Sequence, residues 1–162
     1  MCFVPTKNSV VQVATKNIKC YKRVRPNRNG SMLHGKVVFE SRHRFFSYTL
    51  GDHYKIDRKK DILARRGAGS MIKDYMYGGV FHSFKRYPDD YKWCINIECI
   101  IPKGALFTYN NSEYISNEIK INKIIYKEKH SYSFYDSDIR DFLKYIRKQK
   151  LIQFTTTNVI TQ

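Results

Sequence analysis

The sequence predicts a single α+β domain, in which a twisted, mostly antiparallel sheet is accompanied by one C-terminal amphipathic helix. Short apolar runs alternate with polar residues along most of the chain and are separated by Gly, Pro and Asn. Only the segment 139–150 has a helical period. The 162 residues contain no internal repeat and no linker that divides them. We therefore expect an N-terminal arm or edge strand over 1–17, the domain over 18–153 and a polar tail over 154–162.

The central strand of this sheet is predicted at 93–101, the most apolar run of the sequence. It ends at a Pro-Lys-Gly turn, and a second strand is expected directly after it, over 105–109. The alternation over 114–126 predicts a further strand. Because side chains of a strand point alternately to its two faces, these three runs provide the core of the sheet.

The first secure strand is predicted at 18–24. Its alternation places Cys20, Lys22 and Val24 on one face and Lys19, Tyr21 and Arg23 on the other. The remaining expected elements are a loop over 25–35, strands over 36–41 and 44–54 with a turn at Gly51, a short basic helix before Gly67, a strand over 80–84 and a short helix starting near Pro88.

The predicted helix over 139–150 follows a possible cap at Ser137 and Asp138. Its apolar residues recur at the spacing of one helix face, and Lys and Arg occupy the opposite face. The apolar set is Ile139, Phe142, Leu143 and Ile146.

Positive charge is the strongest global feature of the sequence. Thirty Lys and Arg against fourteen Asp and Glu give a net charge of +16, which favours nucleic acid or an acidic protein surface as a partner. Aromatic residues are interleaved with the cations, as in surfaces that bind nucleic acid by phosphate contacts and stacking. The alternative is a solvated surface with a composition bias toward Lys, Ile, Asn and Tyr. The candidate nucleic-acid-binding residues are Lys22, Arg25, Arg28, Arg42, Arg44, Lys59, Lys60, Arg65 and Arg66.

The four cysteines have no close Cys-x-x-Cys spacing, so no metal site is expected. No secretory signal and no apolar run of membrane-spanning length is present. We therefore expect free thiols, no membrane partner, and a location in the host cytoplasm or inside a virion.

A possible ligand-binding pair lies in the strand over 80–84, where His82 precedes Ser83. His82 is the candidate cofactor-binding residue, and the alternative is a structural histidine. The glycines match no phosphate-binding loop, and no catalytic triad is readable.

The order of the segments 18–24, 79–84, 97–104 and 114–121 resembles a group of small uncharacterised proteins from Bacteroidetes bacteria and their phages. This resemblance covers about residues 1–125 and implies no activity. It implies phage virion proteins as possible partners.

The same order is distantly similar to the ADP-ribosyltransferase fold. That similarity implies NAD as cofactor and a catalytic set of Arg23, Ser83 and Glu118. The sequence departs from the family pattern, because Ser83 lies in His-Ser-Phe and Glu118 has no Glu-x-Glu or Gln-x-Glu pair. These departures favour a non-catalytic relative.

Three functions remain open from the sequence. The first is a non-enzymatic, phage-type protein that binds a polyanion, nucleic acid above all, or a virion or host component, and that needs no cofactor. The second is an NAD-dependent ADP-ribosyltransferase-like enzyme or its inactive relative. The third is a structural or cargo protein of a phage particle.

Overall fold

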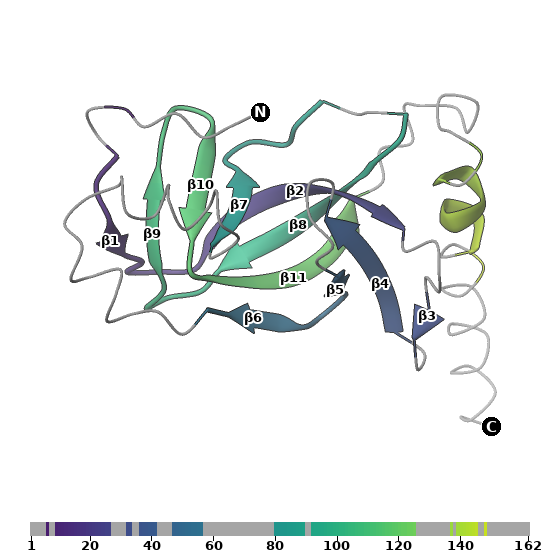
Figure 1. Cartoon of the computed structure of the whole chain (residues 1–162), viewed down its shortest axis with the longest axis horizontal. Coiled ribbons are helices and arrows are strands. Elements are labelled where there is room, and N and C mark those ends of the chain that lie inside the picture. Colours follow the sequence, from purple (N-terminus) through teal and green to yellow (C-terminus); the bar gives the residue numbers. More distant parts are fainter. Residues whose placement is uncertain are drawn as a thin grey trace, which may run out of the picture.

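A computed structural model of the chain describes residues 6, 9–26, 32–33, 36–41, 47–56, 80–89, 92–125, 137, 139–145 and 148 (Figure 1). Within these residues the protein is built mainly from strands, and every strand pairing is antiparallel. The strands are β1 (Gln12–Val13), β2 (Ile18–Pro26), β3 (Met32–Leu33), β4 (Lys36–Ser41), β5 (Ser47–Thr49), β6 (His53–Lys55), β7 (Phe81–Phe84), β8 (Ile95–Ile101), β9 (Leu106–Tyr109), β10 (Glu113–Ser116) and β11 (Glu118–Ile125).

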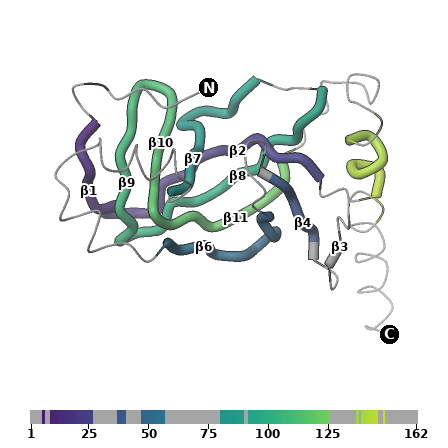
Figure 2. The backbone as a smooth tube through the Cα atoms, viewed as in Figure 1, coloured from purple at the N-terminus to yellow at the C-terminus, as the bar shows by residue number. Residues whose placement is uncertain are grey.

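One sheet contains these strands in the order β1-β9-β10-β7-β2-β8-β11-β6. A branch leaves it at β2, where β4 pairs with the end of β2 and also carries β3 and β5. The long strands β2, β8 and β11 cross the middle of the molecule, with β1, β9 and β10 at one end and β3, β4 and the helix at the other (Figure 1). Figure 2 shows that β2 and β8, which are far apart in the sequence, lie side by side.

Strand β8 is the centre of the sheet, as its apolar sequence predicts. It pairs with β2 from Ile18 opposite Ile101 to Val24 opposite Ile95, and its other edge pairs with β11. Its residues Ile97, Cys99 and Ile101 are completely buried. Because both edges of β8 are paired, its backbone hydrogen bonds are satisfied inside the sheet, and burial of its apolar side chains stabilises its central position.

The two faces of β2 separate as the alternation predicts. Cys20, Lys22 and Val24 are buried on the face that contacts the apolar core, which we call the inner face. Lys19 and Tyr21 lie on the opposite, outer face. Because directly opposite residues of an antiparallel pair point to the same side, this assignment extends to β8, β11 and β6 through their register.

The described helical residues are 137, 139–145 and 148, and the end of the predicted helix, 149–150, lies outside the described residues. Ile139, Phe142 and Leu143 are buried in the core. The ring of Phe142 meets the ring of Phe39 in β4 edge-on, with centroids 5.9 Å apart. The helix therefore packs on the inner side of the β4 branch.

The turn predicted at Gly51 is confirmed, and it divides the expected strand over 44–54 into β5 and β6. Gly51 has a φ of 89°, a conformation that favours glycine. The bend is tied to two strands, because Leu50 N donates to Val37 O at 2.9 Å and Gly51 N donates to Ile121 O at 2.9 Å.

The predicted strand over 114–126 is also interrupted, at Asn117. The Asn117 backbone N–H donates to Leu106 O at 3.1 Å, and its side-chain Oδ1 accepts from Leu106 N at 2.8 Å. These bonds take Asn117 out of the ladder and mark the boundary between β10 and β11. The alternation of the sequence contains no sign of this side-chain bond.

The helix predicted near Pro88 is wrong for residues 87–89, which form an irregular loop. The carbonyl of Pro88 accepts from Asn96 Nδ2 at 3.2 Å, and the carbonyl of Asp89 accepts from Arg23 Nη2 at 2.7 Å. These carbonyls are therefore bonded to side chains of the sheet. The predicted basic helix before Gly67 and the polar tail lie outside the described residues.

A search of the described residues finds no helix with the length and apolar character that crossing a membrane requires.

Candidate polyanion-binding face

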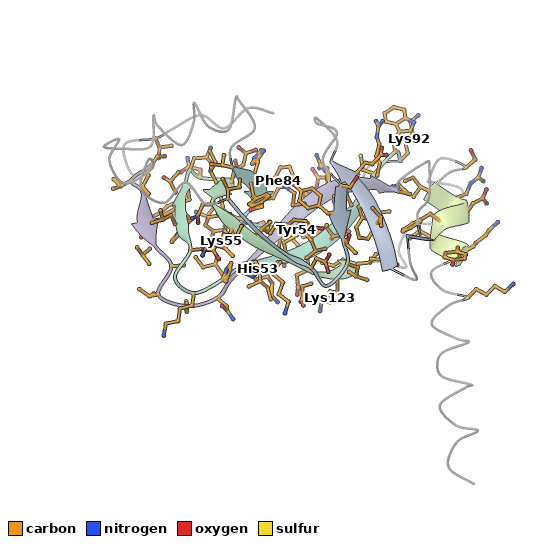
Figure 3. The ribbon with its side chains drawn as sticks, turned by 60° about the horizontal axis from the view of Figure 1, so that its bottom comes forward. His53, Tyr54, Lys55, Phe84, Lys92 and Lys123 are labelled. Carbon is orange, nitrogen blue, oxygen red and sulfur yellow. The ribbon has the colours of Figure 1, made fainter. Side chains whose placement is uncertain are left out.

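Exposed cations gather on the outer face of β6, β11, β8 and β2. In one row across these strands, His53 lies opposite Lys120, Lys120 opposite Ile100, and Ile100 opposite Lys19. The exposed basic residues of this row and its neighbours are Lys19, His53, Lys55, Lys120 and Lys123. We call this set the basic face. In Figure 3, His53 and Lys123 lie on the lower side of the sheet, whereas Tyr54 lies on the other side of its strand.

Glu98 in β8 lies beneath this face. Its Oε2 is 3.6 Å from Lys19 Nζ and 3.7 Å from Lys123 Nζ. Its Oε1 accepts a hydrogen bond from Asn122 Nδ2 at 2.7 Å. Glu98 is buried, whereas the two lysine side chains are 62% and 63% exposed. The ammonium groups therefore lie at the surface above a fixed carboxylate.

A bulge in β11 makes this arrangement possible. The register with β8 shifts between Ile121 and Lys123, so Asn122 is an extra residue in the ladder. A β-bulge redirects the side chains next to it. Here both Asn122 and Lys123 reach Glu98 on the outer face.

Glu118 forms a second site of the same kind at the edge of the sheet. Its Oε2 is 3.2 Å from His53 Nε2, and its Oε1 is 3.2 Å from Lys55 Nζ. Lys120 lies between the two carboxylates and makes no ion pair within the described part of the chain. With histidine neutral, the basic face and its two carboxylates hold four lysines against two glutamates, which leaves two positive charges in excess.

The outer face is covered beyond this row by residues 87–89. The ring of Tyr87 meets the ring of Tyr21 edge-on, with centroids 5.9 Å apart. Arg23 donates to the carbonyl of Asp89 and also lies over the Phe84 ring, at 5.3 Å from its centroid. Arg23 is therefore engaged in holding this loop, whereas Lys19 on the same face of β2 is exposed.

Only two of the nine candidate nucleic-acid-binding residues are described. Arg25 is exposed at the end of β2, whereas Lys22 is buried on the inner face. The Lys22 ammonium donates to the carbonyl of His82 and lies 5.1 Å from the centroid of the Tyr48 ring. We therefore leave Lys22 out of the basic face. The other seven candidates lie outside the described residues, namely Arg28, Arg42, Arg44, Lys59, Lys60, Arg65 and Arg66.

The three residues implied by the transferase resemblance lie on two different faces. Ser83 is buried on the inner face, and its hydroxyl has no hydrogen-bond partner among the described residues. Arg23 and Glu118 are on the outer face, where Arg23 holds the 87–89 loop and Glu118 pairs with His53 and Lys55. The described geometry does not bring these three side chains to one catalytic centre, and the resemblance itself stays a prediction.

His82 is paired with a buried carboxylate. Its Nε2 lies 3.0 Å from Oε1 of Glu113, which is 1% exposed, and the pair connects β7 to β10. Thr108 in β9 lies on the same face, and its buried hydroxyl has no hydrogen-bond partner among the described residues. A carboxylate beside an imidazole orients the ring. The predicted role of His82 in binding a cofactor stays a prediction.

Three thiols of the described residues, Cys20, Cys94 and Cys99, are free and buried, as the spacing of the cysteines predicts. Cys20 lies directly opposite Cys99. Burial raises the pKa of the Cys20 thiol to about 11, and burial also raises the pKa of Cys99. Cys20 and Cys99 are therefore protonated and unreactive at neutral pH. No cluster of three metal-binding side chains is present within the described ranges.

Apart from Lys19, which belongs to the cluster of cations that the sequence shows in the first strand, the residues of the basic face were not among the sequence-based candidates. The alternation over 118–124 places charged residues on one face of a strand, so this part of the basic face can be predicted from the sequence. The sequence does not show that Lys19, about a hundred residues earlier, lies on the same face.

Comparison of the chain with models of known families, with curated proteins and with solved structures gave no match. The similarity to phage proteins therefore stays a prediction.

Proposed function

We propose that the protein binds polyanions, nucleic acid above all, through the basic face. The observation that carries this proposal is the row of His53, Lys120 and Lys19 across four adjacent strands. Adjacent strands lie about 4.8 Å apart, so the row spans roughly 14 Å. A surface of this width supports contacts to several phosphates of one strand.

The chemistry of the basic face favours phosphate contacts over base readout. Lysine binds phosphate as a point charge, without the planar two-bond geometry with which arginine recognises a guanine edge. The one apolar residue in the row, Ile100, offers no hydrogen bond. We therefore expect binding that depends strongly on salt and weakly on sequence.

The direct test is charge reversal at Lys120, which is exposed and has no ion pair to disrupt among the described residues. Lys120→Glu is expected to weaken binding of a labelled oligonucleotide about tenfold or more at 50 mM salt, since it replaces a phosphate contact by a repulsion. The slope of log K against log salt should fall by about 1 to 2. The measurement is fluorescence anisotropy across a salt series.

The matched control is Lys148→Glu, which makes the same charge change at an exposed helical position away from the basic face. Equal losses in the two variants would mean that only net charge matters and would remove the basic face from the proposal. Failure of the unmodified protein to bind at low salt would overturn the proposal. Binding of polyglutamate without binding of nucleic acid would identify an acidic protein surface as the partner.

A further inference from the structure

We infer that Glu98 and Glu118 are built-in competitors for phosphate on the basic face, so that a bound polyanion takes over lysines that each carboxylate otherwise holds. This inference rests on the proposed function and concerns how the affinity of the same face is set. Each carboxylate has two basic partners, Lys19 and Lys123 for Glu98, and His53 and Lys55 for Glu118.

Glu98 is the stronger case because its position is fixed. It is buried, and the Asn122 amide bonds to one of its oxygens at 2.7 Å. The other oxygen alone faces both ammonium groups. The carboxylate therefore cannot move away with its lysines, and it remains fixed under the surface.

The lysines, in contrast, are free to exchange partners. Their distances to Glu98 of 3.6 and 3.7 Å are longer than those of a direct charged hydrogen bond. Both ammonium groups are largely exposed to water, which screens such long ion pairs and keeps them weak. A phosphate that approaches from solvent can thus attract both ammonium groups at little cost.

The consequence is that two lysines and one glutamate act on a polyanion as about one positive charge. Removing the negative charge of Glu98 while keeping the shape of its side chain should make the second positive charge available to the polyanion. For Glu98→Gln we expect affinity for an oligonucleotide to rise about two- to fivefold at 50 mM salt. The salt slope should steepen by about 0.7 for a single strand and about 0.9 for a duplex.

The experiment compares Glu98→Gln with Asp141→Asn in the full chain, using the same labelled oligonucleotide and salt series. Asp141 is an exposed helical carboxylate that lies 4.0 Å from Lys144, so the control changes the net charge equally at another carboxylate–lysine pair. Unchanged binding in Asp141→Asn together with tighter binding in Glu98→Gln supports the inference. Thermal unfolding of each variant establishes that it is folded.

Glu118→Gln provides a second, independent variant, because its carboxylate lies at the edge strand pair and has no amide partner among the residues that the structure describes. It is expected to bind more tightly than Asp141→Asn as well, even if Glu98→Gln does not fold. If every folded Glu→Gln variant binds the oligonucleotide with the same affinity as Asp141→Asn, the inference is overturned. Binding weaker than that of Asp141→Asn shows that the carboxylates orient the lysines instead. In both cases the proposed function stands if the unmodified protein binds the oligonucleotide and the Lys120→Glu variant does not.

Discussion

Lys19 and Lys22 are three positions apart in one strand and have opposite environments. Lys19 is exposed beside Glu98 on the outer face, whereas Lys22 is 8% exposed on the inner face. A buried ammonium needs hydrogen-bond or electrostatic partners, and Lys22 has the His82 carbonyl and the Tyr48 ring. Identical side chains in the same strand therefore have different roles.

Replacement of Lys22 by Met is expected to leave nucleic-acid binding unchanged and to change stability by less than about 1 kcal/mol. The unbranched methionine fills the same space and removes a charge whose burial is unfavourable. Lys22→Ala is expected to lose about 2 to 4 kcal/mol, since it leaves a cavity beside Tyr48. Urea unfolding measures both values. A loss of binding in the folded Met variant would contradict the separation of the two faces.

The buried thiols predict a specific weakness at high pH. The pKa of Cys20 rises from 9.0 in the unfolded chain to about 11 in the folded protein, and burial raises that of Cys99 too. A raised folded pKa means that this contribution to stability is complete below pH 9 and is lost as the pH rises toward 11. The loss from Cys20 amounts to about 2 to 3 kcal/mol across this window.

The matching variant is Cys20→Ala with Cys99→Ala, which has no thiol to ionise at these positions. Its free energy of unfolding should fall less steeply between pH 9 and pH 11 than that of the unmodified protein. Parallel curves for the two proteins would show that other groups cause the alkaline loss. Denaturant unfolding at pH 8, 9, 10 and 11 gives the comparison.

At the level of elements, short turns determine which strands meet. The turn between β8 and β9 contains Gly104 at a φ of 89°. Gly104 N donates to Ala14 O at 2.8 Å, and Lys103 N donates to Asn17 Oδ1 at 2.9 Å. The turn therefore fixes the chain between β1 and β2.

Gly104→Ala is expected to destabilise the protein by about 1 to 2 kcal/mol. A Cβ at this position meets no atom within 4 Å, so the cost is one of backbone conformation and involves no clash. Gly104→Asn should be less destabilising, because asparagine tolerates the left-handed region better than other side chains. Thermal unfolding of the two variants tests this order. Equal losses would point to a cause other than the φ angle.

For the whole molecule, a net charge of +16 makes the folded state sensitive to any polyanion that it binds. A ligand that binds only the folded state stabilises it by about 2.7 kcal/mol at a hundred times its Kd. For a protein of this size we therefore expect an oligonucleotide to raise Tm by about 5 to 10 °C at low salt. The shift should disappear at high salt.

The control for this shift is an oligomer of the same bases on an uncharged peptide backbone. It should leave Tm unchanged, because phosphate contacts carry the proposed binding. An equal shift with the uncharged oligomer would mean that base stacking, and not the basic face, stabilises the protein. Differential scanning fluorimetry across a salt series distinguishes the two outcomes.

The sequence by itself determined the strand-rich core, the central position of β8, the two faces of β2 and the turn at Gly51. These are local properties, since alternation and turn residues act within a few positions of the chain. The loop at 87–89 was not predictable, because its carbonyls are held by Arg23 and Asn96 from other strands. Neither was the boundary at Asn117, which depends on a bond to Leu106.

The candidate site itself was decided only by the tertiary structure. Lys19, His53 and Lys120 come from three strands that are distant in the sequence, and the basic face exists because β2, β8, β11 and β6 pair in one particular register. A shift of one residue in any of these pairings would turn the cations to the inner face. Long-range register arises from burial of the apolar face as a whole, which no local pattern of charges reveals.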